Sequence, residues 1–158
     1  MLSMWKTTLM ELELKGNAKP VCSKTYPLPT VHKKMLKKEV ERIVTLRLLE
    51  EANKSKWGAP SFAQPKAKTN REIILTEFKN LNRKFKYKPC PIPKIREMLL
   101  NLKGFQYDMS LDLNVVYYHT RLSKYANSQS TIILPWGKYK YKRLPMGAYD
   151  CPDISKQE

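Results

Sequence analysis

Helix-like and strand-like segments alternate along this 158-residue chain, and this alternation most constrains the fold. Residues 33–52 repeat apolar positions at steps of three and four, which is typical of an amphipathic helix with a solvated charged face. Two strand candidates follow, residues 60–66 and 71–78, separated by the polar turn "AKTN". Such a series predicts an α+β layer structure that begins with a helix and a hairpin.

The second half of the chain continues the pattern. Residues 93–104 predict a short helix, with Pro93 near its start and Gly104 just past its end. Residues 105–113 predict a strand, and "STIILPWGKYKYKRL", residues 130–144, predicts a second hairpin that turns at "PWGK". We therefore expect two hairpins and at least two helices in one domain.

The first residues differ from the rest, because "KTYPLPTVH" is typical of an extended polyproline-like segment. We expect residues 1–31 to form an extended N-terminal arm and residues 32–158 to form the folded domain. Hydrophobic residues make up 42% of the chain, which argues against global disorder.

The charge balance predicts a polyanionic partner. The chain has 30 Lys and Arg against 14 Asp and Glu, which gives a formal net charge of +16. Nucleic acid is favoured over a membrane surface, because aromatic residues and prolines are interleaved with the cations. The alternative is a basic protein that is merely soluble.

The sequence predicts neither a membrane span, nor a signal peptide, nor a zinc site. No apolar run reaches the roughly 18 residues of a membrane span, and the first residues do not form a convincing signal peptide. The three cysteines are far apart and lack metal-ligand spacing, as expected for reduced thiols. We expect an intracellular chain, cytoplasmic by default, with the nucleus as an alternative.

Asp112 is a candidate metal ligand. It ends the apolar segment "MSLDL", where a carboxylate can emerge at the edge of a sheet. Magnesium prefers carboxylates together with phosphate oxygens, and two such ions clamp the oxygens in nucleotidyl transfer. One aspartate cannot hold both ions, and the spacing alone leaves open whether Asp112 is a ligand or the N-cap of the next turn.

The run "KYKYKR" is a candidate nucleic-acid contact. On a strand, Lys138, Lys140 and Lys142 share one face, and Tyr139 and Tyr141 share the other. The tyrosines can then be buried while the lysines face phosphates, with a salt-dependent affinity. An exposed hairpin kept soluble by lysine is the alternative for each residue.

Several blocks in series resemble a reverse transcriptase. "SLDLNVVYYHTRL", "TIILPWGKYKYKRLPMG" and "CPDI" resemble, in this order, its palm. The upstream blocks "WGAPSFAQPK", "LTEFKNLNRKFKYKPCPIPKI" and "LLNLKGFQY" fall in the same order. The chain is most similar to the polymerase region of the Pol polyproteins of gypsy-like long-terminal-repeat retrotransposons, over about residues 20–155. The resemblance implies the fingers and the N-terminal part of the palm of a right-hand polymerase.

The resemblance also implies roles for particular residues. Asp112 matches the first catalytic aspartate, and Leu113 matches the neighbour whose carbonyl helps to hold Mg²⁺. Tyr117 matches the aromatic residue under the sugar of the incoming nucleotide, although "VVYY" alone favours a core tyrosine. The residues that match the family's nucleotide contacts are Lys66, Lys68, Met146 and Gly147. The residues of the basic hairpin that we assign to the template and primer are Lys138, Lys140, Lys142 and Arg143.

The implied function is RNA-directed DNA polymerisation on an RNA or DNA template-primer, with deoxynucleoside triphosphates as substrates and the rest of the Pol polyprotein as partner. The departures from the family limit this expectation. The sequence ends before the Tyr-x-Asp-Asp hairpin that carries the second and third aspartates, and arginine is missing at Ile73 and Lys79. Val116 stands where a small residue is expected, so we expect a truncated, partly decayed copy.

Three functions remain open from the sequence. The first is a reverse transcriptase fragment that works only within a longer polyprotein and does not extend a primer alone. The second is a non-catalytic, basic nucleic-acid-binding remnant. The third is the poorly folded, nonfunctional product of a degraded reading frame.

Overall fold

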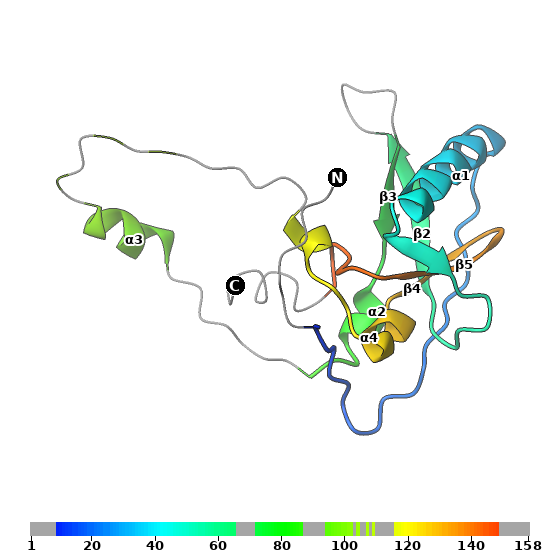
Figure 1. The fold of residues 1–158 in the computed structure, drawn as a ribbon, viewed down its shortest axis with the longest axis horizontal. Helices are drawn as coiled ribbons and strands as arrows, with labels where there is room; N and C mark the ends of the chain where they lie inside the picture. The colour runs from blue at the N-terminus through cyan, green and yellow to red at the C-terminus, as the bar shows by residue number, and fades with distance from the viewer. Residues whose placement is uncertain are drawn as a thin grey trace.

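A five-stranded sheet with the strand order β1-β5-β4-β2-β3 lies in the right-hand part of Figure 1. The computed structural model describes residues 9–65, 72–86, 94–102, 104, 107, 109 and 116–148. The strands of the sheet are β1 (Leu49–Glu51), β2 (Ala59–Pro65), β3 (Glu72–Thr76), β4 (Thr131–Leu134) and β5 (Gly137–Tyr141).

Both predicted hairpins are confirmed. β2 pairs antiparallel with β3, and β4 pairs antiparallel with β5 across the short turn between Leu134 and Gly137. The two hairpins meet where β2 runs parallel to β4, in a short ladder that pairs Ala59 with Ile132 and Pro60 with Ile133.

Gly58 stands just before this ladder, where the backbone passes close to a neighbour. A Cβ at this position would overlap the side chain of Ile133 and lie 3.4 Å from Sγ of Cys22. Glycine is therefore required by the close approach of β2 to β4.

The first helix is shorter than predicted, because α1 covers Thr30–Thr45 and the chain then turns into β1. The residue after the C-cap, Arg47, has φ of +58°, and Leu48 donates its backbone N–H to the carbonyl of Ile43. This is the hydrogen bonding of a Schellman motif, in which glycine usually takes the left-handed position. The expected helix over residues 46–52 is wrong, because the motif is formed here without the glycine that would have indicated it.

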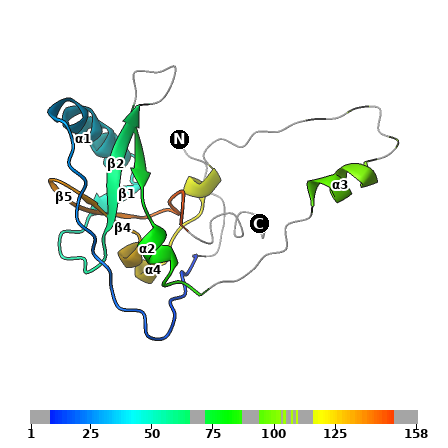
Figure 2. The same ribbon diagram turned by 180° about the vertical axis from the view of Figure 1, so that it is seen from behind.

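The remaining helices are short. The sequence signals of Pro93 and Gly104 bracket α3 as expected, and Gly104 has φ of +80°. α3 lies apart from the sheet in Figures 1 and 2. The helices after α1 are α2 (Lys79–Asn82), α3 (Ile95–Asn101), the 3-10 helix η1 (Val116–His119) and α4 (Lys124–Gln129). The predicted strand over residues 105–113 lies outside the described residues except for Tyr107 and Met109, which belong to no element.

The N-terminal segment is extended, and it packs along the domain. Residues 9–29 contain no helix, and isolated bridges join Met10 to Leu122, Leu14 to Phe85, and Cys22 to Gly58. Leu12 is only 1% exposed and belongs to the core. Residues of the segment therefore contribute to the folded unit.

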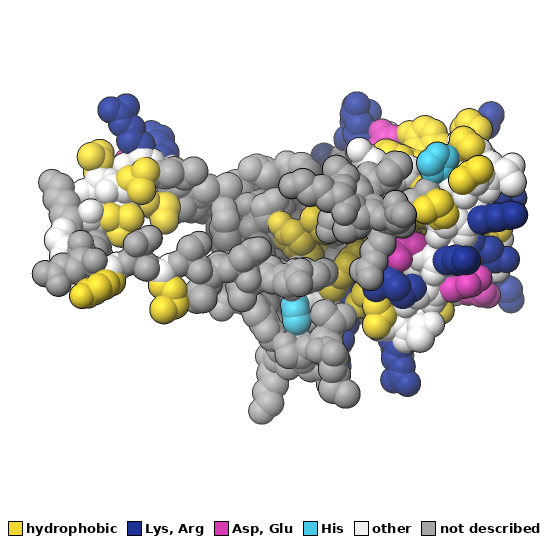
Figure 3. Space-filling model, turned by 90° about the horizontal axis from the view of Figure 1, so that it is seen from above, with side chains coloured by type: hydrophobic (Ala, Val, Ile, Leu, Met, Phe, Trp, Pro, Cys, Tyr) yellow, Lys and Arg dark blue, Asp and Glu magenta, His cyan; other side chains and the backbone are white. Residues whose placement is uncertain are grey.

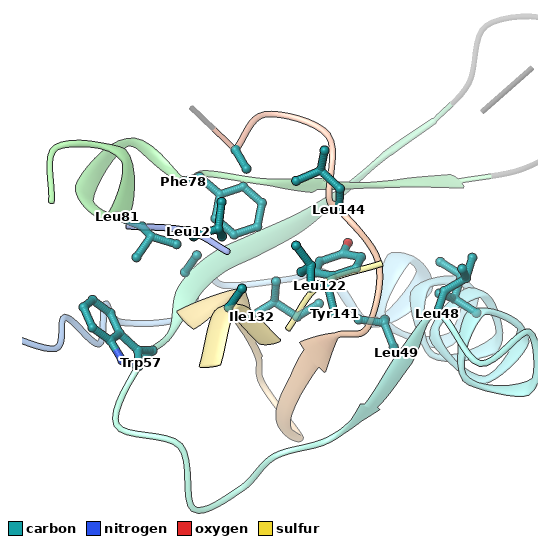
Figure 4. Packing of buried hydrophobic residues seen from close by; sticks show 14 of the residues in the cluster. Leu12, Leu48, Leu49, Trp57, Phe78, Leu81, Leu122, Ile132, Tyr141 and Leu144 are labelled. Carbon is teal, nitrogen blue, oxygen red and sulfur yellow. The ribbon is translucent and has the colours of Figure 1, made fainter. Parts of the chain in front are cut away.

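One hydrophobic core joins α1, the sheet and this segment (Figure 4). Leu36, Val40 and Ile43 are the buried face of α1, which packs against β3 and β1. The side chains labelled in the figure come from the strands, from α2, from the N-terminal segment and from the loops, and they include Leu12, Leu49, Trp57, Phe78, Leu81, Leu122, Ile132, Tyr141 and Leu144.

Candidate nucleic-acid interface

A basic hollow lies beside α2. Its volume is about 630 Å³, and the cationic side chains in its lining are Lys15, Lys79 and Arg83. Phe78 and Phe85 supply apolar lining, and Glu77 is the one carboxylate among the lining residues. The excess of positive charge makes this hollow suited to an anionic ligand.

Local packing determines which side chains of α2 face outward. Phe78, at the N-cap of α2, and Leu81, within α2, are both buried in the core. Their burial fixes the rotation of this short helix. Lys79 and Arg83 are therefore exposed on the other side. In this way α2 and its C-cap residue Arg83 present two cations next to two buried apolar side chains.

Lys15 comes to the hollow from the N-terminal segment. Its backbone N–H donates to the carbonyl of Lys84 at 2.9 Å, and its Nζ donates to the carbonyl of Arg83 at 3.1 Å. These contacts hold the ammonium group of Lys15 beside α2, although Lys15 and Arg83 are 68 residues apart in the sequence.

The hollow adjoins one of the predicted nucleotide-pocket residues. Asn82, in the lining, donates from Nδ2 to the carbonyl of Gly147 at 3.0 Å. Gly147 has φ of +86°, and a Cβ there would lie 3.9 Å from the ring of Phe78. This backbone conformation favours glycine. Met146, the other predicted residue of "LPMG", is 61% exposed.

The carboxylate in the lining has its own partner. The hydroxyl of Tyr26 donates a short hydrogen bond to Glu77, and this bond is the main reason that the pKa of Tyr26 is raised. Glu77 therefore contacts the N-terminal segment through Tyr26 and also lines the basic hollow.

Both partners of this hydrogen bond also line a second, apolar hollow. It has a volume of about 810 Å³, and Tyr26, Pro27, Phe62 and Leu75 line it together with Glu77. The rings of Tyr26 and Phe62 meet edge to face with centroids 5.7 Å apart. Tyr26 is exposed and Phe62 is partly buried, and accessible aromatic rings can stack on nucleobases.

The predicted division of β5 into two faces is confirmed, and the structure adds partners for its lysines. Tyr141 is buried, and Tyr139 packs against the core from the same face. On the opposite face, Lys140 and Lys142 both form ion pairs with Glu50 of β1, at 2.7 and 2.6 Å.

Lys138 is held as well, since its Nζ donates to the carbonyl of Ser55 at 2.9 Å and to Sγ of Cys22 at 3.4 Å. Protein groups therefore already contact all three lysines of the predicted phosphate-facing strip. Their contact with nucleic acid stays a prediction.

The two other described candidates are partly buried. Tyr117 lies in η1 and packs against the core, as the alternative role of a core tyrosine predicts. Arg143 donates from Nη1 to the carbonyl of His119 at 2.9 Å. Burial, followed by the positive charge of Arg121, lowers the pKa of Arg143.

Four predicted site residues, Asp112, Leu113, Lys66 and Lys68, lie outside the described residues. Among the residues that are described, no group of three or more His, Cys, Asp or Glu side chains could hold a metal ion. Within the same part of the chain, no helix has the length and apolar character needed to cross a membrane.

Sequence reasoning missed Lys15 and Arg83 as site residues. It noted Lys79 only as a replacement for an arginine. Lys15 lies in the predicted arm and Arg83 in "NLNRKFK", where a run of cations has no distinguishing spacing. The hydrogen bond from Lys15 to the carbonyl of Arg83 is what brings them together.

Solved structures with the same fold are reverse transcriptases. The chain superimposes on prototype foamy virus protease-reverse transcriptase with a TM-score of 0.82 at 17% identity, covering 98% of this chain and 20% of that one. The foamy viral enzyme in complex with an RNA/DNA hybrid gives a TM-score of 0.83 at 16% identity, with the same coverage. The chain thus has the α+β fold of reverse transcriptase fingers and the adjoining part of the palm.

Sequence relatives narrow this class. The chain is 26% identical over 137 residues to the retrovirus-related Pol polyprotein from transposon 297 of Drosophila melanogaster, which covers 84% of the chain and 13% of the relative. It is 24% identical over 168 residues to a putative enzymatic polyprotein of Cassava vein mosaic virus, covering 99% of the chain and 25% of the relative. No protein-family model matches.

These comparisons confirm the resemblance. The chain shares its fold with a part of a reverse transcriptase, and it is similar in sequence to a part of Pol polyproteins that include the one from transposon gypsy of Drosophila melanogaster. It spans between 13% and 25% of the length of the two relatives named above.

Proposed function

We propose that the chain is a nucleic-acid-binding portion of an RNA-directed DNA polymerase, and that it works within a longer Pol polyprotein. In such a parent, the chemistry is nucleotidyl transfer to a primer, with a deoxynucleoside triphosphate as substrate. The basic hollow beside α2, which adjoins Gly147, is the observation that carries this proposal.

The hollow suits a template strand in charge and in shape. Three cationic side chains can neutralise phosphates, which gives an affinity that depends on salt and hardly on sequence. The nearby Tyr26 and Phe62 offer rings on which unpaired bases can stack. Solved reverse transcriptases of the same fold include a complex with double-stranded DNA and one with an RNA/DNA hybrid, which supports a nucleic-acid partner.

The nucleotide would lie near Gly147 in this proposal. Lys66 and Lys68 would contact its phosphates, Tyr117 would lie under its sugar, and Met146 with Gly147 would line its pocket. Support comes from the left-handed backbone at Gly147, which allows close approach of a ligand to the main chain.

A two-magnesium site would require more carboxylate ligands than the residues assigned to it here. Asp112 and the carbonyl of Leu113 are the ligands that the resemblance implies, and the residues described by the structure add no carboxylate cluster. A two-metal site needs several carboxylates, so these residues do not make a complete one. Bound Mg²⁺ would stabilise the charge that develops during transfer, and we assign no step of that chemistry to this chain.

For the 158-residue chain alone, binding without catalysis is therefore the expected activity. This expectation agrees with the alternative of a non-catalytic remnant, which the same hollow favours because its three cations need no metal. Binding by the remnant would be unchanged by Mg²⁺ and by Asp112→Asn.

Nucleic-acid titrations test the proposal. The purified chain should bind single-stranded RNA or DNA, and the triple variant Lys15→Gln, Lys79→Gln, Arg83→Gln should bind roughly tenfold more weakly. The slope of log K against log salt should fall by about 2, because each phosphate contact on a single strand contributes about 0.7. A matched control neutralises Lys19, Lys24 and Lys56, which are exposed and lie outside the hollow.

Equal losses in the triple variant and in the control would reject the hollow as a binding site. Primer extension assays with Mg²⁺ form the second arm, in which the chain alone should incorporate no deoxynucleotide. Measurable incorporation would overturn the assignment of binding without catalysis.

A further inference from the structure

Four lysines project from the first half of α1. Lys33, Lys34, Lys37 and Lys38 are all exposed, and none of their side chains forms a hydrogen bond or an ion pair within the described part of the chain. We call these four residues the lysine face. Lys140 of β5 and Lys15 of the basic hollow each contact a protein group through the ammonium group, whereas the ammonium groups of these four do not.

The lysine face does not stabilise the helix that carries it. The N-terminus of a helix bears a partial positive charge, which favours acids in the first turn. α1 has no acid in its first turn and no side-chain cap at Pro29. Lysines three and four residues apart also repel each other. Lys33 lies in the first turn, and the four like charges repel one another, so an external anion on this face would stabilise the helix.

The acids of α1 do not relieve this repulsion. Glu39 is bound by Arg42, with hydrogen bonds of 2.6 and 2.8 Å, and this contact raises the pKa of Arg42. Glu41 lies after the four lysines and forms no described ion pair with them. In the right-hand part of Figure 3, where α1 lies, dark-blue side chains outnumber magenta ones.

The core determines the direction of the lysine face. Leu36, Val40 and Ile43 are buried against the sheet, so Lys34 and Lys38 point away from it. These two residues follow one another along the helix at a spacing of roughly 6 Å, four residues at 1.5 Å each. They form a row of point charges that a chain of phosphates can follow.

This surface is separate from the basic hollow. No residue of α1 lines the hollow. In Figure 1, α1 and α2 lie at opposite ends of the sheet, with α1 at the upper right and α2 below the strands. A ligand on the lysine face would therefore leave the hollow open.

We propose that the lysine face of α1 is a second binding surface for the phosphate backbone of nucleic acid. Flexible lysines without aromatic neighbours among them suit sequence-independent phosphate contacts. A membrane surface fits less well, because an interfacial helix needs a broad free apolar face, and the apolar face of α1 is already buried. The second surface holds a strand outside the hollow, and it does not require the hollow to bind.

The test compares two variants of equal charge. Lys34→Gln with Lys38→Gln should lower the salt slope for single-stranded DNA by about 1.4 and weaken binding severalfold. The control Lys54→Gln with Lys56→Gln removes two exposed lysines from the loop between β1 and β2. It should reduce the salt slope and the affinity less than the lysine-face variant does. Far-ultraviolet circular dichroism should show an intact fold in both variants, and the lysine-face variant should melt no earlier than the wild type.

Stoichiometry distinguishes the two surfaces. A short oligonucleotide should bind twice to the wild type and once to either the lysine-face variant or the hollow variant. If the lysine-face variant and the loop control have the same affinity and the same salt slope, this inference is overturned. If the wild type binds a single oligonucleotide and only the lysine-face variant loses it, this inference is supported and the hollow is rejected as a binding site.

Vesicles of phosphatidylglycerol and phosphatidylcholine provide the last arm. Loss of vesicle binding in the lysine-face variant, with oligonucleotide binding unchanged, would assign the surface to membranes and overturn the inference. Absence of vesicle binding by the wild type, with oligonucleotide binding reduced in the variant, would support it.

Discussion

At the scale of single residues, Glu50 decides how much charge β5 presents to solvent. Its two carboxylate oxygens pair with Lys140 and Lys142, so the strip of three lysines carries a built-in counter-ion. The hydrogen bond from Lys140, followed by that from Lys142, lowers the pKa of Glu50. Any nucleic acid that binds these lysines must compete with this carboxylate.

We expect Glu50→Gln to strengthen nucleic-acid binding and to weaken the fold slightly. Removing the carboxylate frees two ammonium groups, so the salt slope should rise while the free energy of unfolding falls by less than about 1 kcal/mol, since the pair is partly exposed. Glu51→Gln, which removes the same charge from the next residue of β1, is the control. No difference in binding between the two variants would contradict the prediction.

The same pair predicts a pH dependence of stability. The pKa of Glu50 is lower in the folded state than in the unfolded chain, so its contribution is fully present above the ordinary glutamate pKa. It is lost as the pH falls through the lowered folded pKa. Urea unfolding of the wild type and of Glu50→Gln should therefore converge in acid and diverge near neutral pH.

At the scale of elements, the parallel contact between β2 and β4 holds the two hairpins in one sheet. It is short, and it depends on Gly58, because a side chain there would enter the space of Ile133. The sequence "WGAP" indicates a turn, but it does not indicate that a strand passes this close.

We expect Gly58→Ala to destabilise the fold by about 1–3 kcal/mol through overpacking. Gly16→Ala is the matched control, because nothing lies within 4 Å of a Cβ at that position. Thermal melts should show a clear drop for the first variant and almost none for the second. Shortening the opposing side chain with Ile133→Ala should make the added methyl group at position 58 less harmful, and an additive loss would contradict the steric explanation.

At the scale of the whole molecule, the net charge of +16 repels itself in the compact state. The described ion pairs involve few of the cations, so much of this repulsion remains. A polyanion relieves it, and so does salt.

We expect the melting temperature to rise with sodium chloride. Screening from low to physiological ionic strength should add on the order of 1 kcal/mol, or about 2–4 °C for a chain of this size. Chloride is preferable to sulfate, because sulfate also strengthens burial of apolar groups. A melting temperature that falls with salt would mean that attractive ion pairs outweigh the repulsion.

The sequence by itself predicted the resemblance to reverse transcriptases, the two hairpins and the presence of the amphipathic helix. These features rest on local patterns: strand alternation, turn residues and blocks in series. The end of α1 escaped prediction, because Arg47 takes the left-handed position without being glycine. The 3-10 helix over residues 116–119 and the strand β1 are short, and short elements carry little periodicity.

Tertiary structure alone decided which cations are available to a ligand. Lys140 and Lys142 are paired because β1 lies beside β5, and Lys15 reaches the hollow because its segment pairs beside Phe85. The physical reason is that the field at a lysine depends on the groups within a few ångströms of it, and strand pairing brings those groups from distant parts of the chain.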